Sequence, residues 1–195
     1  GENRGDVERF KEDYCGYLDA NTLRAGYPES KRVAEAMCQA YKKQKQLDVA
    51  IARLSRIYGP TMLMSDSKAS SQFIKNGLKG EDIVLKSKGE QLFSYCYVAD
   101  AVAALLTILL CGENGEAYNI ADVKSDVTLA DLAQIIAGSC GRKVVFDLPN
   151  AVEAAGFSKA SKALLDSTKL SQLGWNAAYT IETGMAETLS ILRSV

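Results

Sequence analysis

A tyrosine and a lysine four residues apart have the types and spacing to do chemistry. Tyr27 and Lys31 open a segment in which apolar residues recur at helical intervals. On a helix, positions i and i+4 lie one above the other, so the Lys31 ammonium can approach the Tyr27 hydroxyl. A nearby cation favours phenolate and lowers the pKa of a tyrosine from its usual value of about 10. Such a tyrosine can take a proton from a hydroxyl whose carbon loses a hydride. The alternative is an exposed pair on a solvated helix.

The elements that would position this pair alternate between helix and strand. Pro28 suits the first turn of a helix that begins near Tyr27, and basic Lys42–Lys45 suits its end. Residues 47–57 form a buried-strand pattern, and Thr128–Asp131 is a capping box that opens a helix to about residue 138. Further helices are predicted over residues 67–78, 99–111, 168–173 and 181–193, and further strands over residues 82–86, 94–98, 117–120 and 143–148. This alternation predicts an α/β fold.

Composition excludes several classes of function. The chain has no histidine, which excludes histidine metal sites and Ser-His or Cys-His triads, and we expect no metal. A net charge of −1 counts against a nucleic-acid or anionic-membrane surface. The five cysteines are widely spaced, as expected for reduced packing thiols in a cytoplasmic protein. The longest apolar run, residues 101–111, is too short to span a bilayer.

Five ordered motifs carry a resemblance to a known family. In chain order they are Tyr27-Pro-Glu-Ser-Lys31, Arg53-Leu-Ser-Arg56-Ile-Tyr58-Gly59-Pro60, Gly89-Glu-Gln91-Leu-Phe93-Ser-Tyr95-Cys-Tyr97-Val98-Ala-Asp100, Tyr118-Asn119-Ile120, and Asp166-Ser-Thr-Lys169 followed by Leu173-Gly174-Trp175. Together they resemble the extended short-chain dehydrogenase/reductases, the NAD-dependent sugar-nucleotide epimerase/dehydratase family. Within it, Asp66-Ser-Lys68 before Phe73, and the run Ser94–Val98, look most like UDP-glucuronate decarboxylases.

The resemblance implies an enzyme that oxidises a sugar hydroxyl with NAD, then epimerises, eliminates or decarboxylates, and returns the hydride. Tyr27 would be the acid/base, and Lys31 would tune it and touch the nicotinamide ribose. The substrate would be a nucleotide sugar, and the intact enzyme a homodimer. The rival interpretation is a non-catalytic member that uses the fold to bind a ligand or partner. The implied substrate-binding residues are Arg56, Lys68, Gln91 and Phe93.

The resemblance also predicts a fragment. The family begins with a dinucleotide-binding half whose glycine-rich loop seats the pyrophosphate, and no such loop stands here before Tyr27. Gly1 matches the glycine that follows the family's catalytic Ser/Thr. We therefore expect the C-terminal part of a Rossmann-type enzyme, unable to bind NAD by itself and prone to self-association. Residues 1–60 would be a remnant of the dinucleotide-binding domain, and residues 61–195 mainly a small mixed α/β substrate-binding domain, with some segments returning to the Rossmann part.

Two substrate positions depart from the family pattern. The family has asparagine at the position of Arg56 and arginine at the position of Phe93, and both usually help to hold the substrate diphosphate. One interpretation is compensation, in which Arg56, with Lys68, neutralises the phosphates. The others are a different substrate, or an Arg56 that is simply paired with an acidic side chain.

Overall fold

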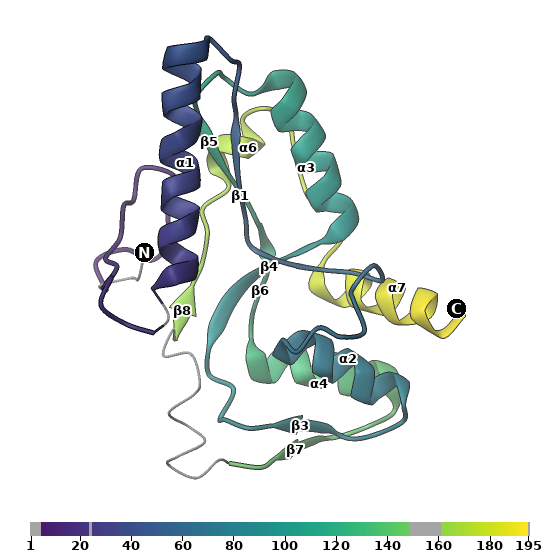
Figure 1. Ribbon diagram of the computed structural model, residues 1–195. Coiled ribbons are helices and arrows are strands. Elements are labelled where there is room, and N and C mark those ends of the chain that lie inside the picture. Colours follow the sequence, from purple (N-terminus) through teal and green to yellow (C-terminus); the bar gives the residue numbers. More distant parts are fainter. Residues whose placement is uncertain (1–4, 24, 149–160, 195) are drawn as a thin grey trace.

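The computed structural model describes residues 5–23, 25–148 and 161–194, which fold into a mixed α/β structure (Figure 1). Its helices are α1 (Gly26–Lys45), α2 (Ala69–Leu78), α3 (Val98–Cys111), α4 (Leu129–Cys140), α6 (Thr168–Ser171) and α7 (Ile181–Ser194). Its strands are β1 (Ile51–Leu54), β2 (Arg56–Tyr58), β3 (Ile83–Leu85), β4 (Leu92–Tyr97), β5 (Ala117–Ile120), β6 (Asp122–Thr128), β7 (Val144–Phe146) and β8 (Lys162–Ala163).

The strands form three separate sheets. Parallel β1 and β5 lie between α1 and α3 in the upper part of Figure 1. In the second sheet, β4 pairs in parallel with β2 and β8 and antiparallel with β6. The third sheet is the parallel pair β3 and β7, which lies below α2 and α4 in the same view.

The chain crosses between the first two sheets almost without connecting residues. Ser55 alone separates β1 from β2, and Ala121 alone separates β5 from β6. Helix α3, which packs against β1 and β5, follows β4 directly at Tyr97 and Val98. The two sheets are therefore joined by two single-residue connections, and α3 packs against strands of both.

Two hydrophobic clusters make up the core. The larger lies between the β4 sheet and helices α2, α4 and α7, and includes Tyr58, Phe93, Ile136 and Met185. The smaller joins α3 to β1, β5 and the far side of β4, and its largest member is Trp175. Because Cys96 belongs to the smaller cluster while the neighbouring tyrosines of β4 belong to the larger, this strand has buried side chains on both faces.

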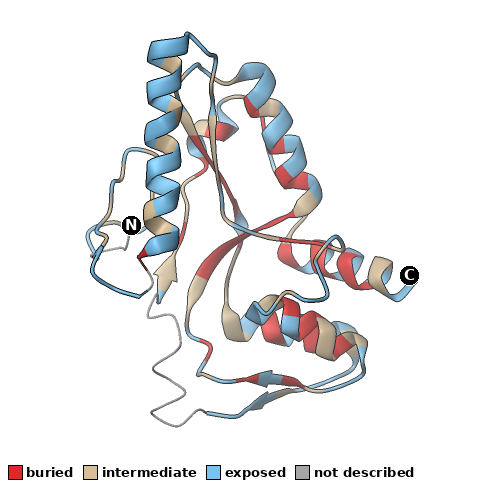
Figure 2. Cartoon of the chain, in the orientation of Figure 1, coloured by how far each residue is buried: buried red, intermediate tan, exposed pale blue. Residues whose placement is uncertain are grey.

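Helix α1 differs from the other long helices in its burial. No residue of α1 is buried, and the helix is pale blue over most of its length in Figure 2. Its apolar side chains Val33, Met37 and Tyr41 are exposed by 56%, 51% and 49%, so they contribute no core packing in this chain.

The predicted α/β class and most predicted elements are confirmed, one prediction is corrected, and strands β6 and β8 were not predicted. The buried strand predicted over residues 47–57 is wrong: it is two short strands in different sheets, because the Ser55 N–H bonds Ile120 O at 3.0 Å and the chain then turns to pair with β4. Strand β6 was not predicted, because its polar residues, such as Asp122, break any apolar alternation. The predicted match of Gly1 lies outside the described residues.

Candidate functional site

The predicted chemical couple lies in the first turns of α1. The Lys31 ammonium stands 5.5 Å from the centroid of the Tyr27 ring. Tyr27 is 74% exposed, so its hydroxyl is open to a ligand. The helix begins at Gly26 with Pro28 in the first turn, and it ends where Gln46 takes a left-handed conformation with φ of 54°. The helical spacing thus brings the Lys31 ammonium over the Tyr27 ring, and the predicted approach to the hydroxyl stays a prediction.

Polar side chains dock α1 against β1 and β5. Arg53 on β1 donates from Nε and Nη2 to the two carboxylate oxygens of Glu35, at 2.8 and 2.7 Å. Its third nitrogen, Nη1, donates to Glu12 O at 2.7 Å. Near the other end of the helix, Gln39 and Lys42 donate to backbone oxygens of the turn that precedes β5. The helix is thereby attached to the sheet along one side.

The two positions that depart from the family pattern are in direct contact. The Arg56 guanidinium lies 3.4 Å from the centroid of the Phe93 ring. Arg56 forms no ion pair with any described residue, so the interpretation that an acidic side chain neutralises it is not supported among residues 5–23, 25–148 and 161–194. Desolvation by burial lowers the pKa of Arg56. The desolvation is only partial, because the residue keeps an exposed surface. Within the described part of the chain, Arg56 is therefore a cation stacked on a ring without an acidic ion-pair partner.

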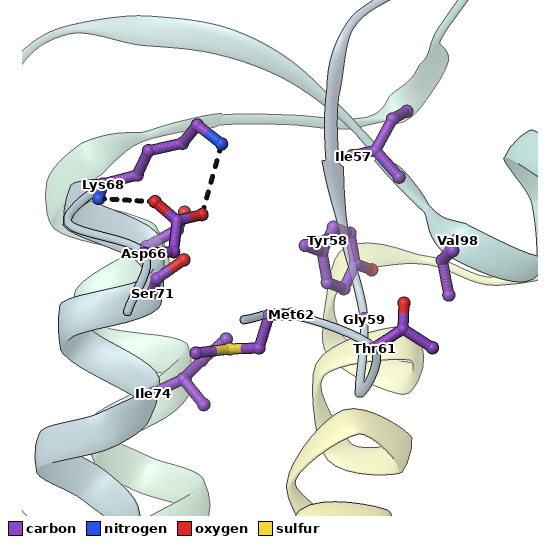
Figure 3. A pocket seen from close by; sticks show the side chains of 11 residues that line it. Ile57, Tyr58, Gly59, Thr61, Met62, Asp66, Lys68, Ser71, Ile74 and Val98 are labelled. Atoms are coloured by element: carbon purple, nitrogen blue, oxygen red, sulfur yellow. Dashed lines mark hydrogen bonds and ion pairs between the residues drawn. The ribbon is translucent and has the colours of Figure 1, made fainter. Parts of the chain in front are cut away.

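A small pocket lies between the end of β2 and the start of α2, and neither Arg56 nor Phe93 lines it. Figure 3 shows Lys68 and Asp66 on one side and Tyr58 facing them across the opening. Its volume of about 120 Å³ is too small for a whole nucleotide sugar. A side chain at Gly59 would overlap Val98, so only glycine fits the close approach at this turn. Because strand side chains alternate, Arg56 and Tyr58 project from the same face of β2.

Lys68 lines this pocket but is already paired. Its ammonium lies 3.2 Å from Asp66 Oδ2, and its backbone N–H donates to Asp66 Oδ1 at 2.9 Å. These contacts, the backbone hydrogen bond first, lower the pKa of Asp66. The Asp66 carboxylate therefore partly neutralises the Lys68 ammonium. We expect Arg56, which has no such partner among the described residues, to attract an anion more strongly.

Gln91 stands apart from the other predicted substrate residues. Its backbone oxygen accepts from Leu129 N at 2.9 Å, and its side-chain oxygen accepts from Ser87 Oγ at 3.5 Å. Within the described residues no hydrogen bond or ion pair joins Gln91 to Arg56 or Lys68. The structure thus pairs Tyr27 with Lys31 and Arg56 with Phe93, and leaves Gln91 in the turn before β4.

Two titratable groups on β2 and β4, one in the pocket and one on the far side of β4, are unsuited to proton transfer. Burial raises the pKa of the Tyr58 phenol, whose hydroxyl donates to Thr180 O at 3.3 Å, so it stays protonated. Burial also raises the pKa of the Cys96 thiol to about 12. Among the described residues no group of three or more potential ligands could hold a metal ion. In the same residues, no helix has both the length and the apolarity needed to cross a bilayer.

The sequence prediction missed two residues that the structure places at these sites. Glu35 contacts Arg53 from α1, and its signal was its spacing of four residues after Lys31. Tyr58 lines the pocket opposite Lys68, and its signal was the adjacent Gly59-Pro60 turn.

Comparison with known proteins agrees with this geometry. Residues 2–121 match the profile of the NAD dependent epimerase/dehydratase family. UDP-glucuronic acid decarboxylase 1 of Xenopus tropicalis is 32% identical over 190 residues, which cover 96% of this chain and 44% of that protein. The Danio rerio protein of the same name is 32% identical over 185 residues, which cover 94% of this chain and 43% of that protein. The chain therefore spans less than half the length of these relatives.

Solved structures give the same result. UDP-glucose 4-epimerase of Thermotoga maritima, determined with UDP-glucose, aligns with a TM-score of 0.76 at 25% identity, over 86% of this chain and 53% of that chain. The dTDP-glucose 4,6-dehydratase of Bacillus anthracis, in complex with NAD, aligns with a TM-score of 0.77 at 25% identity, over 95% of this chain and 56% of that chain. The predicted fold, that of part of a Rossmann-type extended short-chain dehydrogenase/reductase, is confirmed. On the family profile, the motifs and the fold together, the chain belongs to the NAD dependent epimerase/dehydratase family.

Proposed function

We propose that this chain is the substrate-binding portion of an NAD-dependent enzyme that acts on a nucleotide sugar by transient oxidation of a sugar hydroxyl. The observation that carries the proposal is the contact between Lys31 and Tyr27 on an exposed helix turn, 5.5 Å from ammonium to ring centroid. Family membership and the decarboxylase, epimerase and dehydratase relatives support it. UDP-glucuronate is the first substrate to test, because the curated relatives are named for its decarboxylation.

In this proposal the chain supplies the proton chemistry. Tyr27 acts as the phenolate, which the neighbouring Lys31 ammonium stabilises, and it becomes the neutral phenol when it accepts the proton of the sugar hydroxyl. The bound NAD would take up the hydride and return it. Both side chains suit a contact with its ribose, because each is exposed and neither hydrogen-bonds through its side chain to a described residue. We propose no further NAD contact from this chain. We also propose that residues 1–60 are a remnant of the dinucleotide-binding domain and that residues 61–195 are mainly the substrate-binding part.

Arg56 is the proposed partner of the substrate diphosphate. Its guanidinium lies 3.4 Å from the centroid of the Phe93 ring and forms no ion pair with a described residue. It projects from the face of β2 that also carries Tyr58 of the pocket. A phosphate oxygen would accept a charge-assisted hydrogen bond from Arg56. The cost in side-chain entropy of Arg56 would be small, because the Phe93 ring already holds the guanidinium. Replacing Arg56 by alanine in the full-length protein should therefore weaken nucleotide-sugar binding by about 1.5–3 kcal/mol.

The decisive experiment replaces Tyr27 in the full-length protein that contains this chain. Tyr27→Phe should lower the turnover number by about 10²–10⁴-fold and leave the affinity for nucleotide sugars unchanged, because the hydroxyl acts when the proton moves. Tyr41→Phe is the matched control, since Tyr41 is an exposed tyrosine of the same helix, and it should keep full turnover. A Tyr27→Phe protein as active as the parent would refute the acid/base role.

The exchanged pair keeps a second function open. If Arg56 and Phe93 mark a member that binds a ligand without turning it over, the full-length protein would bind nucleotide sugars and convert none of them. Such a result would favour the non-catalytic alternative. We also propose that the intact enzyme is a homodimer, which sedimentation of the full-length protein would test.

A further inference from the structure

The placement of α1 relies on polar contacts. A helix in a globular protein is usually held by an apolar face buried against the core. No residue of α1 is buried, and Figure 2 shows the helix exposed over most of its length. Among the described residues, three side-chain hydrogen-bond contacts to other parts of the chain hold it instead: Glu35 to Arg53, Gln39 to Gly115 O at 2.7 Å, and Lys42 to Asn114 O at 2.7 Å.

These contacts lie on the side of the helix that carries the chemical couple. Glu35 follows Lys31 by four residues and Tyr27 by eight, so the three side chains lie in one row along the helix. Gln39 and Lys42 hold the distant half. The contact between Glu35 and Arg53 is therefore the one of the three nearest to Tyr27, and it sets how the first half of α1 is rotated about its axis.

Arg53 has the geometry to fix that rotation. Its two bonds to Glu35, at 2.8 and 2.7 Å, form a planar fork that only an arginine can make. Its side chain is 32% exposed and that of Glu35 is 33% exposed, so water screens the pair less than a fully exposed one. The hydrogen bond to Glu35 raises the pKa of Arg53.

The same arginine also fixes a second segment. Its Nη1 donates to Glu12 O at 2.7 Å, while Glu12 Oε1 accepts from Asn119 N on β5 at 2.8 Å. Arg53 and Asn119 are register partners across β1 and β5. One side chain thus ties α1, β1 and the segment around Glu12 into a single arrangement.

We propose that Arg53 is a positioning residue for the Tyr27–Lys31 couple and acts through Glu35. The inference rests on the proposed function for its effect on catalysis, and on the contacts alone for its effect on α1. An arginine with a purely structural role would instead stabilise the whole molecule and leave the geometry of the couple unchanged.

The catalytic test uses the full-length protein with Arg53→Met, Arg53→Lys and Glu35→Gln. A displacement of about 1 Å at a reacting group can cost roughly 10²-fold in rate, so Arg53→Met should lower kcat by about ten- to a hundredfold with KM little changed. Arg53→Lys should recover part of the loss, because it keeps the charge but not the fork. Arg32→Met is the matched control: Arg32 has a side chain that is 59% exposed and pairs only with Glu29 of the same helix among the described residues, at 3.7 Å, so its loss should not change kcat.

Hydrogen exchange of the 195-residue chain gives a readout that does not depend on activity. Arg53→Met should increase exchange in residues 26–38 and 10–14 and leave β4 and α4 as protected as in the parent. An equal increase everywhere, or parental kcat in the full-length Arg53→Met protein, would overturn the proposal. Failure of the proposed function is seen separately, as full turnover by Tyr27→Phe, and the exchange pattern still decides whether Arg53 positions α1.

Discussion

The contact between Arg56 and Phe93 predicts a measurable coupling between two positions where this chain departs from its family. The guanidinium lies 3.4 Å from the ring centroid, and Phe93 is 6% exposed. Cation–π contacts contribute about 0.5–1 kcal/mol when exposed and about 2 kcal/mol when desolvated. Because the ring is buried while Arg56 keeps an exposed surface, we expect a coupling free energy of about 1 kcal/mol.

A double-mutant cycle isolates this coupling from the cost of altering the core. Arg56→Met keeps an extended apolar side chain and removes the charge, and Phe93→Leu should cost up to about 1.5 kcal/mol by itself. Urea unfolding of the parent, both single variants and the double variant can be followed by fluorescence of Trp175, the single tryptophan of the chain. Trp175 is 5% exposed, so its emission should respond to unfolding.

The control cycle combines Arg56→Met with Phe73→Leu. Phe73 is 4% exposed in the same cluster as Phe93, but no ring contact joins it to Arg56. Its coupling to Arg56 should be within about 0.3–0.5 kcal/mol of zero. A coupling equally small for Phe93 would refute the reasoning, because Arg56 would then not be held by the ring and would have no preformed orientation toward a phosphate.

Three further predictions concern the chain by itself. The buried Asp100 carboxylate accepts backbone N–H groups of residues 178–179 at 2.9 and 3.0 Å, so Asp100→Ala should lower the free energy of unfolding by about 3–5 kcal/mol in urea titrations. Because burial raises the pKa of the Cys96 thiol to about 12, this thiol stays protonated at lower pH and should resist a thiol-specific reagent that modifies exposed Cys111. Equal labelling of the two cysteines in a mass-spectrometric time course would contradict this. The chain should self-associate through the apolar side of α3, where Leu109 is 77% exposed, and Leu109→Lys should shift light scattering toward the monomer; a strictly monomeric parent at high concentration would contradict it.

The sequence was sufficient where a local signal determined the structure. The Thr128–Asp131 capping box forms as predicted, with Asp131 N donating to Thr128 Oγ1 at 3.0 Å. The position of the Lys31 ammonium over the Tyr27 ring follows from helical spacing alone, although its predicted approach to the hydroxyl stays a prediction. These features depend on residues three or four positions apart, so they need no knowledge of the rest of the molecule.

Predictions that depended on distant segments were less complete. The single strand predicted over residues 47–57 is wrong because two different partners, β5 and β4, pair with successive parts of the same run. The stacking of Arg56 on Phe93 joins residues on neighbouring strands, and only the departure of both from the family pattern pointed to them. The contact of Arg53 with Glu35 likewise depends on the placement of α1 beside β1. No residue of α1 is buried, so a hydrophobic pattern in the sequence could not predict that placement.

The two single-residue connections between the first two sheets limit how this protein can move. Hinged domains need several residues whose backbone angles can change together, and here Ser55 and Ala121 are single residues, while α3 packs against strands of both sheets. Because both connections would have to bend at once, the two sheets should move and unfold as one cooperative unit. Closure around a ligand would then come from side chains and surface turns, such as the one at Gly59 and Pro60. Inserting flexible residues at both positions 55 and 121 should weaken this coupling and divide a single unfolding transition into two.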